Sequence, residues 1–438
     1  MKKLSIITTR LTSFLLTKVG RGGSLPGQIG LKLDANVLRD LKYDCPIILV
    51  TGTNGKTSTA NMIGDLFEHA GYHVISNRRG DNMKEGIATT ILTNTSLNGK
   101  VNADAIVLET DELNVRHVLP VLPVSALVAT NFFRDQLDRY KATETMIEAI
   151  ECVLPDYEGE LVLNGNDVNT VRLSLKAPKA HATYYGLGKN AYSSTDSKEA
   201  GEGKFCPICG ERLDYEYYQY SHIGKYSCPS CGFKTPDLDV EIKDIDLTKE
   251  NFMYDGDLYK SPYEGMYSMY NCAAVFAIAK KFGIDPSIAR EVFEKAPQPK
   301  GRNEHFNVGG TDWTLNLIKN TTGANEVLKV VEKDPSEKAI ILVLNDNESD
   351  GTDVSWIYDT AFEKLMNDKT KLFVCSGLRG NDMALRLYYG GYEGPIKVID
   401  SLDEVVKTAR NTNLKVYAIA NFTALLPTRN AILKEMKS

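Results

Sequence analysis

A six-residue glycine loop between an apolar run and a helical pattern constrains the fold of this sequence more than any other feature. Ile47–Val50 is typical of a buried strand and leads into Gly52-Thr53-Asn54-Gly55-Lys56-Thr57. A helical pattern follows and ends near Gly71, a residue typical of helix C-caps. Backbone N–H groups of such a loop surround phosphate oxygens, while Lys56 reaches the terminal phosphates and Thr57 offers a hydroxyl to Mg²⁺. The motif predicts a phosphate loop that binds ATP.

This loop is shorter than the strict phosphate-loop pattern, which has another glycine where this chain has Val50. The alternative is a glycine turn that a Lys-Thr pair follows by chance. The strand before the loop and the helix after it favour the phosphate loop.

Strand and helix patterns alternate along the rest of the chain. Strands are predicted at 104–109 and 125–130, and helices at 142–153, 265–283 and 286–296, the last with Asp285 as its cap. The alternation predicts an α/β fold whose parallel-rich sheets carry helices on both faces.

A change of pattern at Pro297-Gln298-Pro299-Lys300-Gly301 indicates a hinge, after which the alternation restarts. We therefore expect an N-terminal amphipathic segment at 1–42, a central ATP-binding domain at 43–300 and a smaller Rossmann-like α/β domain at 301–438.

Polar side chains follow three predicted strands at their carboxyl ends, the edge where open α/β sheets bind ligands. Glu109 ends one strand and is placed to hold Mg²⁺ beside a phosphate loop; otherwise it is a solvated strand end. A polar run starts at Thr130 after the second strand, and Asn164-Gly165-Asn166-Asp167 follows the third. The run at Thr130 is alternatively a charged helix start.

Four of the eight cysteines form the pairs Cys206-Pro-Ile-Cys209 and Cys228-Pro-Ser-Cys231. This spacing predicts an inserted zinc ribbon at 204–234, and four protein ligands leave no open position, so the metal is expected to be structural. The alternative is two redox pairs. The remaining cysteines are expected to be buried free thiols: Cys45, Cys152, Cys272 and Cys375.

Charge and hydropathy argue against two classes of partner. The chain has 51 Lys+Arg against 57 Asp+Glu, and the ribbon segment is nearly charge-balanced, so nucleic-acid binding is not expected. No stretch reaches the ~18 apolar residues that a membrane-spanning helix needs. We expect a cytoplasmic protein.

The N-terminal residues imitate a signal peptide, but Arg10 interrupts the apolar run and no small-residue cleavage site follows. Leu4, Ile7, Leu11 and Phe14 repeat at helical spacing, which predicts an amphipathic helix packed on the body of the protein. A second interpretation is a weak membrane-surface contact through basic side chains: Lys2, Lys3, Arg10 and Lys18.

Four segments, in the same order along the chain, resemble motifs of the Mur ligase family, which also includes folylpolyglutamate synthetases. They are the GTNGKT loop at 52–57, a T-N-x-x-x-D-H-x-D segment at 130–138 with Gln136 in place of His, an N-x-D-D turn at 164–167 with Asn166 in place of the first Asp, and G-R-x-E at 301–304. The resemblance implies that ATP activates a carboxylate as an acyl phosphate, which a nitrogen nucleophile then attacks.

Two features distinguish the chain from ordinary Mur ligases. Both are similar to the MurT branch of the family, the synthetase subunits of lipid II isoglutaminyl synthases. The phosphate loop begins at residue 52, without room for a domain that grips UDP, and a four-cysteine ribbon interrupts the central domain. Segments at 315–320, 344–359 and 421–424 add to the similarity. The resemblance implies a heterodimer with a GatD-type glutaminase, lipid II as the substrate at the membrane surface, and amidation of its D-glutamate to D-isoglutamine. The rival function is a ligase that adds an amino acid.

The resemblance also implies that one aspartate of the acidic loop 346–353 orients the catalytic histidine of the partner. We favour Asp350, with Asp346 and Asp353 as rivals; alternatively the acidic turn caps the next helix. Because a triphosphate and a carboxylate repel each other, the site also needs Lys56, Mg²⁺ and further cations. The residues expected at the nucleotide are Gly52, Thr53, Asn54, Gly55, Lys56, Thr57, Asn131, Arg134, Asn164, Asp167, Arg302 and Lys319, with Thr57 and Glu109 at Mg²⁺.

Overall fold

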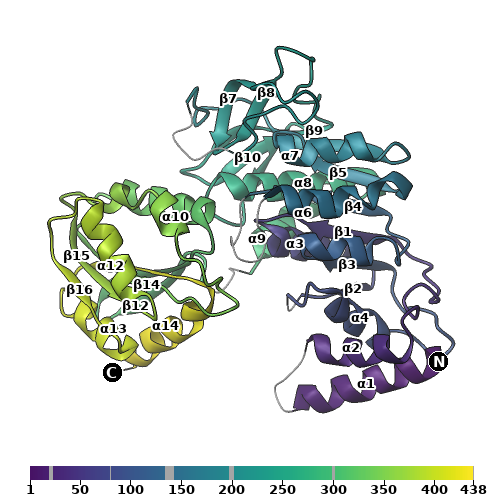
Figure 1. The fold of residues 1–438 in the computed structure, drawn as a ribbon, viewed down its shortest axis with the longest axis horizontal. Helices are drawn as coiled ribbons and strands as arrows, with labels where there is room; N and C mark the ends of the chain where they lie inside the picture. The colour runs from purple at the N-terminus through teal and green to yellow at the C-terminus, as the bar shows by residue number, and fades with distance from the viewer. Residues whose placement is uncertain (19–22, 79, 134–142, 197–201, 298–300, 438) are drawn as a thin grey trace. The chain divides into compact units, whose positions relative to one another are not determined.

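The computed structural model of the protein (Figure 1) describes residues 1–18, 23–78, 80–133, 143–196, 202–297 and 301–437. These residues form two compact units, one of residues 1–133 with 143–296 and one from Pro297 onward. Among the described residues, no helix is both long enough and apolar enough to cross a bilayer.

A nine-stranded sheet forms the centre of the first unit, in the order β11-β10-β9-β6-β5-β4-β1-β3-β2. The seven neighbouring strands β9, β6, β5, β4, β1, β3 and β2 pair in parallel. Beyond β9, β10 and β11 add antiparallel pairs, and β11 forms that edge of the sheet. The predicted parallel-rich sheet is therefore confirmed. The strands are β1 (Ile47–Thr51), β2 (Val74–Ser76), β3 (Ala105–Glu109), β4 (Ala126–Ala129), β5 (Glu160–Asn164), β6 (His181–Leu187), β9 (Val240–Asp246), β10 (Asn251–Tyr254) and β11 (Asp257–Lys260).

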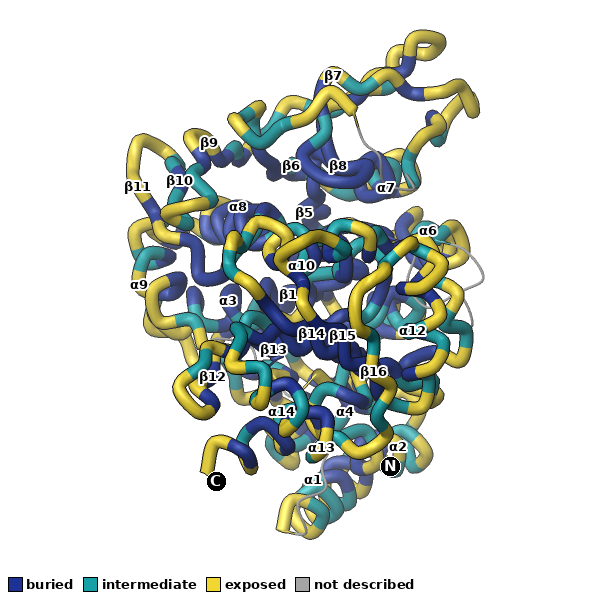
Figure 2. Tube along the Cα trace, turned by 90° about the vertical axis from the view of Figure 1, so that its left-hand side faces the viewer, coloured by how far each residue is buried: buried dark blue, intermediate teal, exposed yellow. Residues whose placement is uncertain are grey.

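Helices cover both faces of this sheet, which is why its central strands β1, β3, β4 and β5 are mostly apolar and buried at every residue. In Figure 2, buried residues are dark blue, as along β1. Ile48 and Val50 of β1 pack with α3, α8 and α9, whereas Ile47 and Leu49 pack with α4, α5 and α6. The helices are α3 (Lys56–His69), α4 (Lys84–Thr93), α5 (Val115–Val118), α6 (Thr143–Glu151), α7 (Val168–Val171), α8 (Met266–Phe282) and α9 (Ile288–Lys295).

Glycines bound α8 at both ends, as the sequence predicts: Gly265 precedes it and Gly283, in the left-handed conformation, ends it. The next helix, α9, begins two residues later than predicted. Asp285 accepts a hydrogen bond from Ser287 N at 2.9 Å, and this turn occupies the first residues of the expected helix.

Two N-terminal helices, α1 (Lys2–Lys18) and α2 (Ser24–Leu33), pack on α4. The predicted helix at the N-terminus is confirmed, but the prediction that its apolar face packs on the body of the protein is wrong. Ser5 and Thr9 face α2, where their hydroxyls donate to the carbonyl oxygens of Gly30 (2.8 Å) and Pro26 (3.3 Å). Most of the large apolar side chains of α1 point outward.

The second unit has a six-stranded sheet in the order β12-β13-β17-β14-β15-β16, parallel except for the β12–β13 pair. Helices α13 and α14 cover one face, and α10, α11 and α12 cover the other. Its elements are β12 (Glu304–Val308), β13 (Thr311–Leu317), α10 (Thr321–Lys333), β14 (Lys338–Val343), α11 (Trp356–Asp359), β15 (Thr370–Ser376), α12 (Gly380–Tyr389), β16 (Ile396–Val398), α13 (Leu402–Arg410), β17 (Lys415–Ala420) and α14 (Phe422–Glu435).

Of the four scattered cysteines, Cys272 and Cys375 are buried as predicted, and Cys45 is half-buried. The prediction is wrong for Cys152, which is exposed in the turn that follows α6.

Candidate functional site

The glycine loop connects β1 to α3 and has the backbone geometry of a phosphate loop. Gly52 (φ 121°) and Gly55 (φ 84°) occupy the positive-φ region that favours glycine. A Cβ on Gly52 would lie 2.3 Å from Thr130 Oγ1, so a larger residue does not fit there. Lys56 is the first residue of α3, and the partial positive charge of this helix N-terminus faces the loop.

Asn131, two residues after the end of β4, holds the backbone of this loop. Its Oδ1 accepts from Asn54 N at 2.9 Å, and its Nδ2 donates to Asn54 O at 3.0 Å. The Asn131 carbonyl accepts from Thr53 N at 2.7 Å, and Thr130 Oγ1 donates to Asn54 O at 2.8 Å. Because both polar backbone groups of Asn54 are paired, the shape of the loop is fixed before any ligand binds.

Lys56 forms a buried ion pair with Glu112, which lies in a short 3-10 helix after β3. The Nζ–Oε1 distance is 3.1 Å, and the two side chains are 10% and 3% exposed. Nζ also donates to Thr53 O at 3.2 Å. These contacts keep the ammonium group within the loop, because a buried charge needs a partner and hydrogen bonds.

The two predicted magnesium ligands lie at this end of the sheet. Parallel pairing aligns Glu109, at the end of β3, with Val50, two residues before the glycine loop. Its carboxylate accepts from Asn82 Nδ2 at 3.0 Å, and Thr57 is exposed in the first turn of α3. Carboxylate and hydroxyl oxygens are the hard ligands that Mg²⁺ prefers, so these residues fit that ion.

The turn from Asn164 to Asp167 is buried and contacts the residues after β4 that hold the phosphate loop, Thr130 to Phe132. Asn164 Nδ2 donates to Thr130 O at 3.0 Å, and Asp167 Oδ2 accepts from Phe132 N at 3.0 Å. Asn164 and Asp167 are fully buried. Asn164 and Asp167 are therefore both hydrogen-bonded to the segment after β4 that supports the phosphate loop.

A hairpin of β7 (Asp214–Tyr220) and β8 (Ile223–Ser227) reaches the same turn. His222, at its tip, lies 3.1 Å from Asp167 Oδ1 through Nε2, and both side chains are nearly fully buried. The His222 ring also packs on Phe133, with 4.7 Å between ring centroids, and Phe133 N donates to Thr53 Oγ1 at 3.1 Å. A chain of contacts therefore joins the hairpin to the phosphate loop.

The residue that replaces the family's first aspartate, Asn166, joins the same buried network. Its Oδ1 accepts from Leu187 N at 2.8 Å and from the Tyr270 hydroxyl at 3.0 Å, and its carbonyl accepts from Gly224 N at 2.9 Å. Burial raises the pKa of Tyr270 well above its ordinary value, so the hydroxyl stays protonated and donates.

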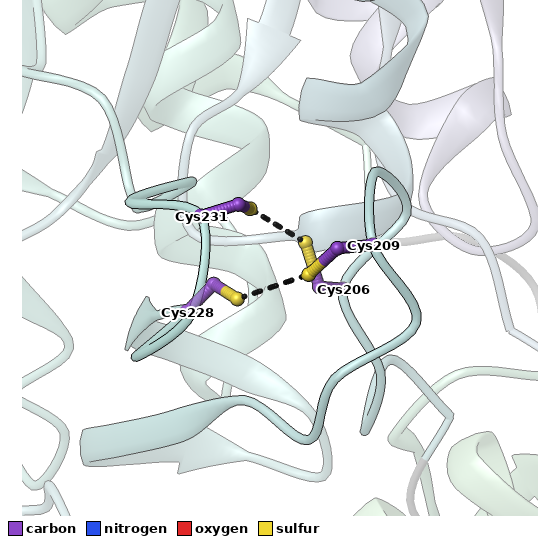
Figure 3. A group of neighbouring side chains, drawn as sticks. All are labelled: Cys206, Cys209, Cys228 and Cys231. Carbon is purple, nitrogen blue, oxygen red and sulfur yellow. Dashed lines mark hydrogen bonds between the residues drawn. The ribbon is translucent and has the colours of Figure 1, made fainter.

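The four ribbon cysteines gather at the other end of the hairpin (Figure 3). Their sulfur atoms all lie within 4.8 Å of one another, with 3.4 Å between Cys206 and Cys231 and 3.5 Å between Cys209 and Cys228. A zinc–thiolate tetrahedron with bonds of about 2.3 Å has edges of roughly 3.8 Å. The arrangement fits one tetrahedral Zn²⁺ with no position left for a substrate.

In the second unit, the acidic loop is tied to the start of α14. Asp350 is 5% exposed; its Oδ1 accepts from Thr423 N at 2.8 Å, and the Thr423 hydroxyl donates to Oδ2. Asp346 pairs with Arg379 at 2.7 Å, and Asp353 accepts from Ser355 N at 2.8 Å just before α11. Asp353 thus supports the next helix, whereas Asp350 caps a helix about 70 residues further along the chain.

Of the other residues predicted to bind the nucleotide, Arg302 and Lys319 are described in the structure and Arg134 is not. Arg302 and Lys319 are partly buried in the second unit, where Glu304 of the same G-R-x-E motif pairs with Arg429 at 2.8 Å. Arg134 lies outside the described residues, as does Gln136.

Comparisons with known proteins agree with these features. The family model described as Mur ligase middle domain matches residues 50–229, and the model described as MurT ligase C-terminal matches residues 317–425. A Streptococcus pneumoniae protein named lipid II isoglutaminyl synthase (glutamine-hydrolyzing) subunit MurT is 34% identical over 99% of this chain and 98% of its own length. The protein of that name from Staphylococcus aureus N315 is also 34% identical, over 93% of this chain and 92% of its own length.

The chain belongs to the MurT family.

Solved structures share its fold at lower identity. A pseudomurein peptide ligase type C from Methanothermus fervidus superposes with a TM-score of 0.70 at 20% identity, covering 91% of this chain and 81% of that one. MurF from Acinetobacter baumannii superposes with a TM-score of 0.66 at 14% identity, covering 94% of this chain and 81% of that one. The Mur-ligase-like α/β fold expected for a MurT protein is thereby confirmed.

The structure adds three residues of this MurT site that sequence reasoning missed. Glu112 pairs with Lys56, and His222 contacts Asp167 in the buried turn next to the phosphate loop. Asn271 of α8 lies against Gly55, since a Cβ on that glycine would be 2.4 Å from Asn271 Oδ1. The buried Nδ2 of Asn271 has no hydrogen-bond partner among the described residues, so a donor is available beside the loop.

Lys56→Gln should weaken binding of a non-hydrolysable ATP analogue by at least about tenfold, because the amide retains hydrogen bonding to Glu112 but loses the positive charge. Isothermal titration in the presence of Mg²⁺ measures the effect. Lys249→Gln, at an exposed lysine, is the control. Equal affinities for the two variants would contradict the nucleotide site.

Cys228→Ser should remove the zinc expected at one ion per chain, since a structural tetrahedral site needs all four thiolates. Metal analysis of the purified chain measures this, and the exposed Cys152→Ser is the control. Full zinc content in the Cys228 variant would show that the cluster is not the metal site.

His222→Ala should lower the free energy of unfolding by about 1–3 kcal/mol, because Asp167 loses a buried hydrogen-bond partner and Phe133 loses a packed ring. The exposed His73→Ala should change it by less than about 0.5 kcal/mol. Urea unfolding compares the two. If their stabilities match, the hairpin contact does not support the central unit.

Proposed function

We propose that this MurT-family chain is the ATP-dependent synthetase subunit of a lipid II isoglutaminyl synthase. The observation that carries the proposal is a phosphate loop already shaped by Asn131, in a chain that is similar over nearly its full length to proteins of that name. The enzyme would be a carbon–nitrogen ligase of peptidoglycan precursor synthesis.

The reaction has two steps. An oxygen of the α-carboxylate of D-glutamate, in the stem peptide of lipid II, attacks the γ-phosphorus of ATP. The bond from this phosphorus to the bridging oxygen breaks, ADP leaves, and an acyl phosphate is formed. The nitrogen of ammonia then attacks the acyl carbon, phosphate leaves with the C–O electron pair, and loss of a proton gives the D-isoglutamine amide.

We assign separate residues of the chain to binding the ATP phosphates and to neutralising their charge. Lys56, held by Glu112, faces the terminal phosphates, and the loop N–H groups contact their oxygens. Thr57 and Glu109 would hold Mg²⁺, which neutralises charge on the transferred phosphoryl group. We assign Arg134, Arg302 and Lys319 as further cations, and Asn164 and Asp167 as the support of the loop.

Ammonia requires a second protein in this proposal, because no Cys/His nucleophile motif of a glutaminase occurs in the chain. We propose a GatD-type glutaminase as the partner and Asp350 as the carboxylate that orients its histidine. Two hydrogen bonds from Thr423 hold the Asp350 carboxylate in one orientation, which suits a residue that fixes an imidazole.

The proposed substrate is linked to a lipid, so the complex would work in the cytoplasm, peripherally at the inner face of the membrane. The four cysteines would hold a zinc ion that supports the ribbon and takes no part in the chemistry.

Mass spectrometry of lipid II tests this function directly. The chain is incubated with lipid II in detergent, Mg²⁺-ATP and either ammonium or glutamine with the glutaminase. The carboxylate of D-glutamate should become a carboxamide, a change of about one mass unit, only when ATP is present. Lipid II that stays unchanged in every reaction overturns the proposal, and incorporation of an amino acid instead would establish the rival ligase function.

Asp350→Asn should reduce glutamine-dependent amidation at least about hundredfold, because an amide does not hold the partner's imidazole in the required form. Amidation driven by ammonium should persist, since that reaction bypasses the glutaminase. Asp353→Asn, which alters a neighbouring turn, is the matched control. Loss of both reactions, or of neither, would refute the role of Asp350 across the interface.

A further inference from the structure

The outward face of α1 is apolar along its whole length. Leu4, Ile7, Leu11, Phe14 and Leu15 are 47–58% exposed, and their spacing places them along one side of the helix. Surface helices normally turn such a stripe toward the core. In this chain it faces away from α2 and α4, the helices on which α1 packs.

Packing on the inner side prevents α1 from turning this stripe inward. The inner face consists of Ser5, Ile6 and Thr9, and both hydroxyls hydrogen-bond to carbonyl oxygens of α2. A Cβ on Gly30 would lie 2.3 Å from Thr9 Oγ1, so the helices are too close for leucine side chains between them. The exposed stripe is therefore a fixed feature of the fold.

The charge of this region is positive, although the whole chain carries a net charge of −6. Residues 1–33 contain six Lys/Arg and no Asp or Glu. Lys3 and Lys18 are exposed near the two ends of α1, and Lys32 is exposed at the end of α2. Lys18 Nζ lies 4.4 Å from the centre of the Phe14 ring, so a cation borders the apolar stripe.

Two of the four basic residues expected to face a membrane have other contacts. Lys2 Nζ donates to Asp40 O at 2.9 Å, and Arg10 donates to Thr95 O. These two side chains hold α1 against the rest of the first unit. Lys3 and Lys18 remain as the exposed cations of the helix.

We infer that α1 lies on an anionic lipid bilayer, with its apolar stripe between the headgroups and its exposed lysines at the phosphates. An apolar face bordered by lysines and free of acidic residues matches such a surface. A second copy of the chain is a poorer partner, because pairing two α1 helices would bring their positive charges together. The inference deepens the proposed function and rests on its placement of the complex at a membrane surface, since it names the helix that contacts the lipid; α1 contains none of the residues assigned to catalysis.

Co-sedimentation of the full chain with lipid vesicles tests the inference. Vesicles of phosphatidylcholine with about one-third phosphatidylglycerol should bind the chain, and vesicles of phosphatidylcholine alone should bind it more weakly. Leu11→Ser/Phe14→Ser should lower the partition coefficient by at least about tenfold. Lys3→Gln/Lys18→Gln should remove the preference for the anionic vesicles.

Leu175→Ser/Leu258→Ser is the matched control, since these leucines of the first unit are 48% and 53% exposed and lie outside α1. The control should bind vesicles like the unchanged chain, and all variants should keep its thermal midpoint and ATP affinity. Equal vesicle binding by the α1 variant and the control overturns the inference. So does an α1 variant that keeps vesicle binding but loses self-association or glutaminase binding, because the stripe would then be a protein interface. Amidation of lipid II in detergent needs no vesicle, so failure of the proposed function would be recognised separately.

Discussion

The hydrogen bonds between Asn131 and the backbone of Asn54 set the geometry on which the site of this MurT protein depends. A loop with glycines at positive φ has many accessible conformations, and fixing one costs backbone entropy. A single side-chain amide satisfies both the N–H and the carbonyl of Asn54, so the folded protein meets this cost before nucleotide arrives. Glu112 and the Thr53 carbonyl oxygen then contribute to holding the ammonium group of Lys56 in place.

Support for Asn131 comes from parts of the chain that are distant in sequence. Asp167 accepts a hydrogen bond from Phe132, the residue after Asn131, and contacts His222 at the tip of the β7–β8 hairpin. The four clustered cysteines flank the other end of this hairpin. A buried carboxylate needs such partners, because desolvation penalises an unpaired charge. The hairpin beside the four-cysteine cluster is therefore connected to the phosphate loop by a continuous set of contacts. A metal ion held by these cysteines would have a physical route to affect the proposed nucleotide site.

Local sequence patterns predicted much of this arrangement. The apolar run before the glycine loop predicted a buried strand, and the glycines around α8 predicted the two ends of a helix; both predictions are confirmed. The inward face of α1 was predicted wrongly because periodicity shows which residues share a face but not which elements cover it; Ser5 and Thr9 take the inner side through close packing against Gly30. Glu112, His222 and Asn271 carry no local signal, since each acquires its role from a residue more than 50 positions away.

Titration of Asn131→Ala with Mg²⁺-ATP, alongside the unchanged chain, tests most directly whether this braced loop is the nucleotide site. The variant loses both side-chain contacts to Asn54 but keeps the carbonyl that accepts from Thr53, so the fold should survive with a similar thermal midpoint. We predict a rise in Kd of at least about tenfold, equivalent to about 1.4 kcal/mol. An unchanged Kd in a folded variant would contradict the account, because ATP would then bind without the geometry that Asn131 imposes.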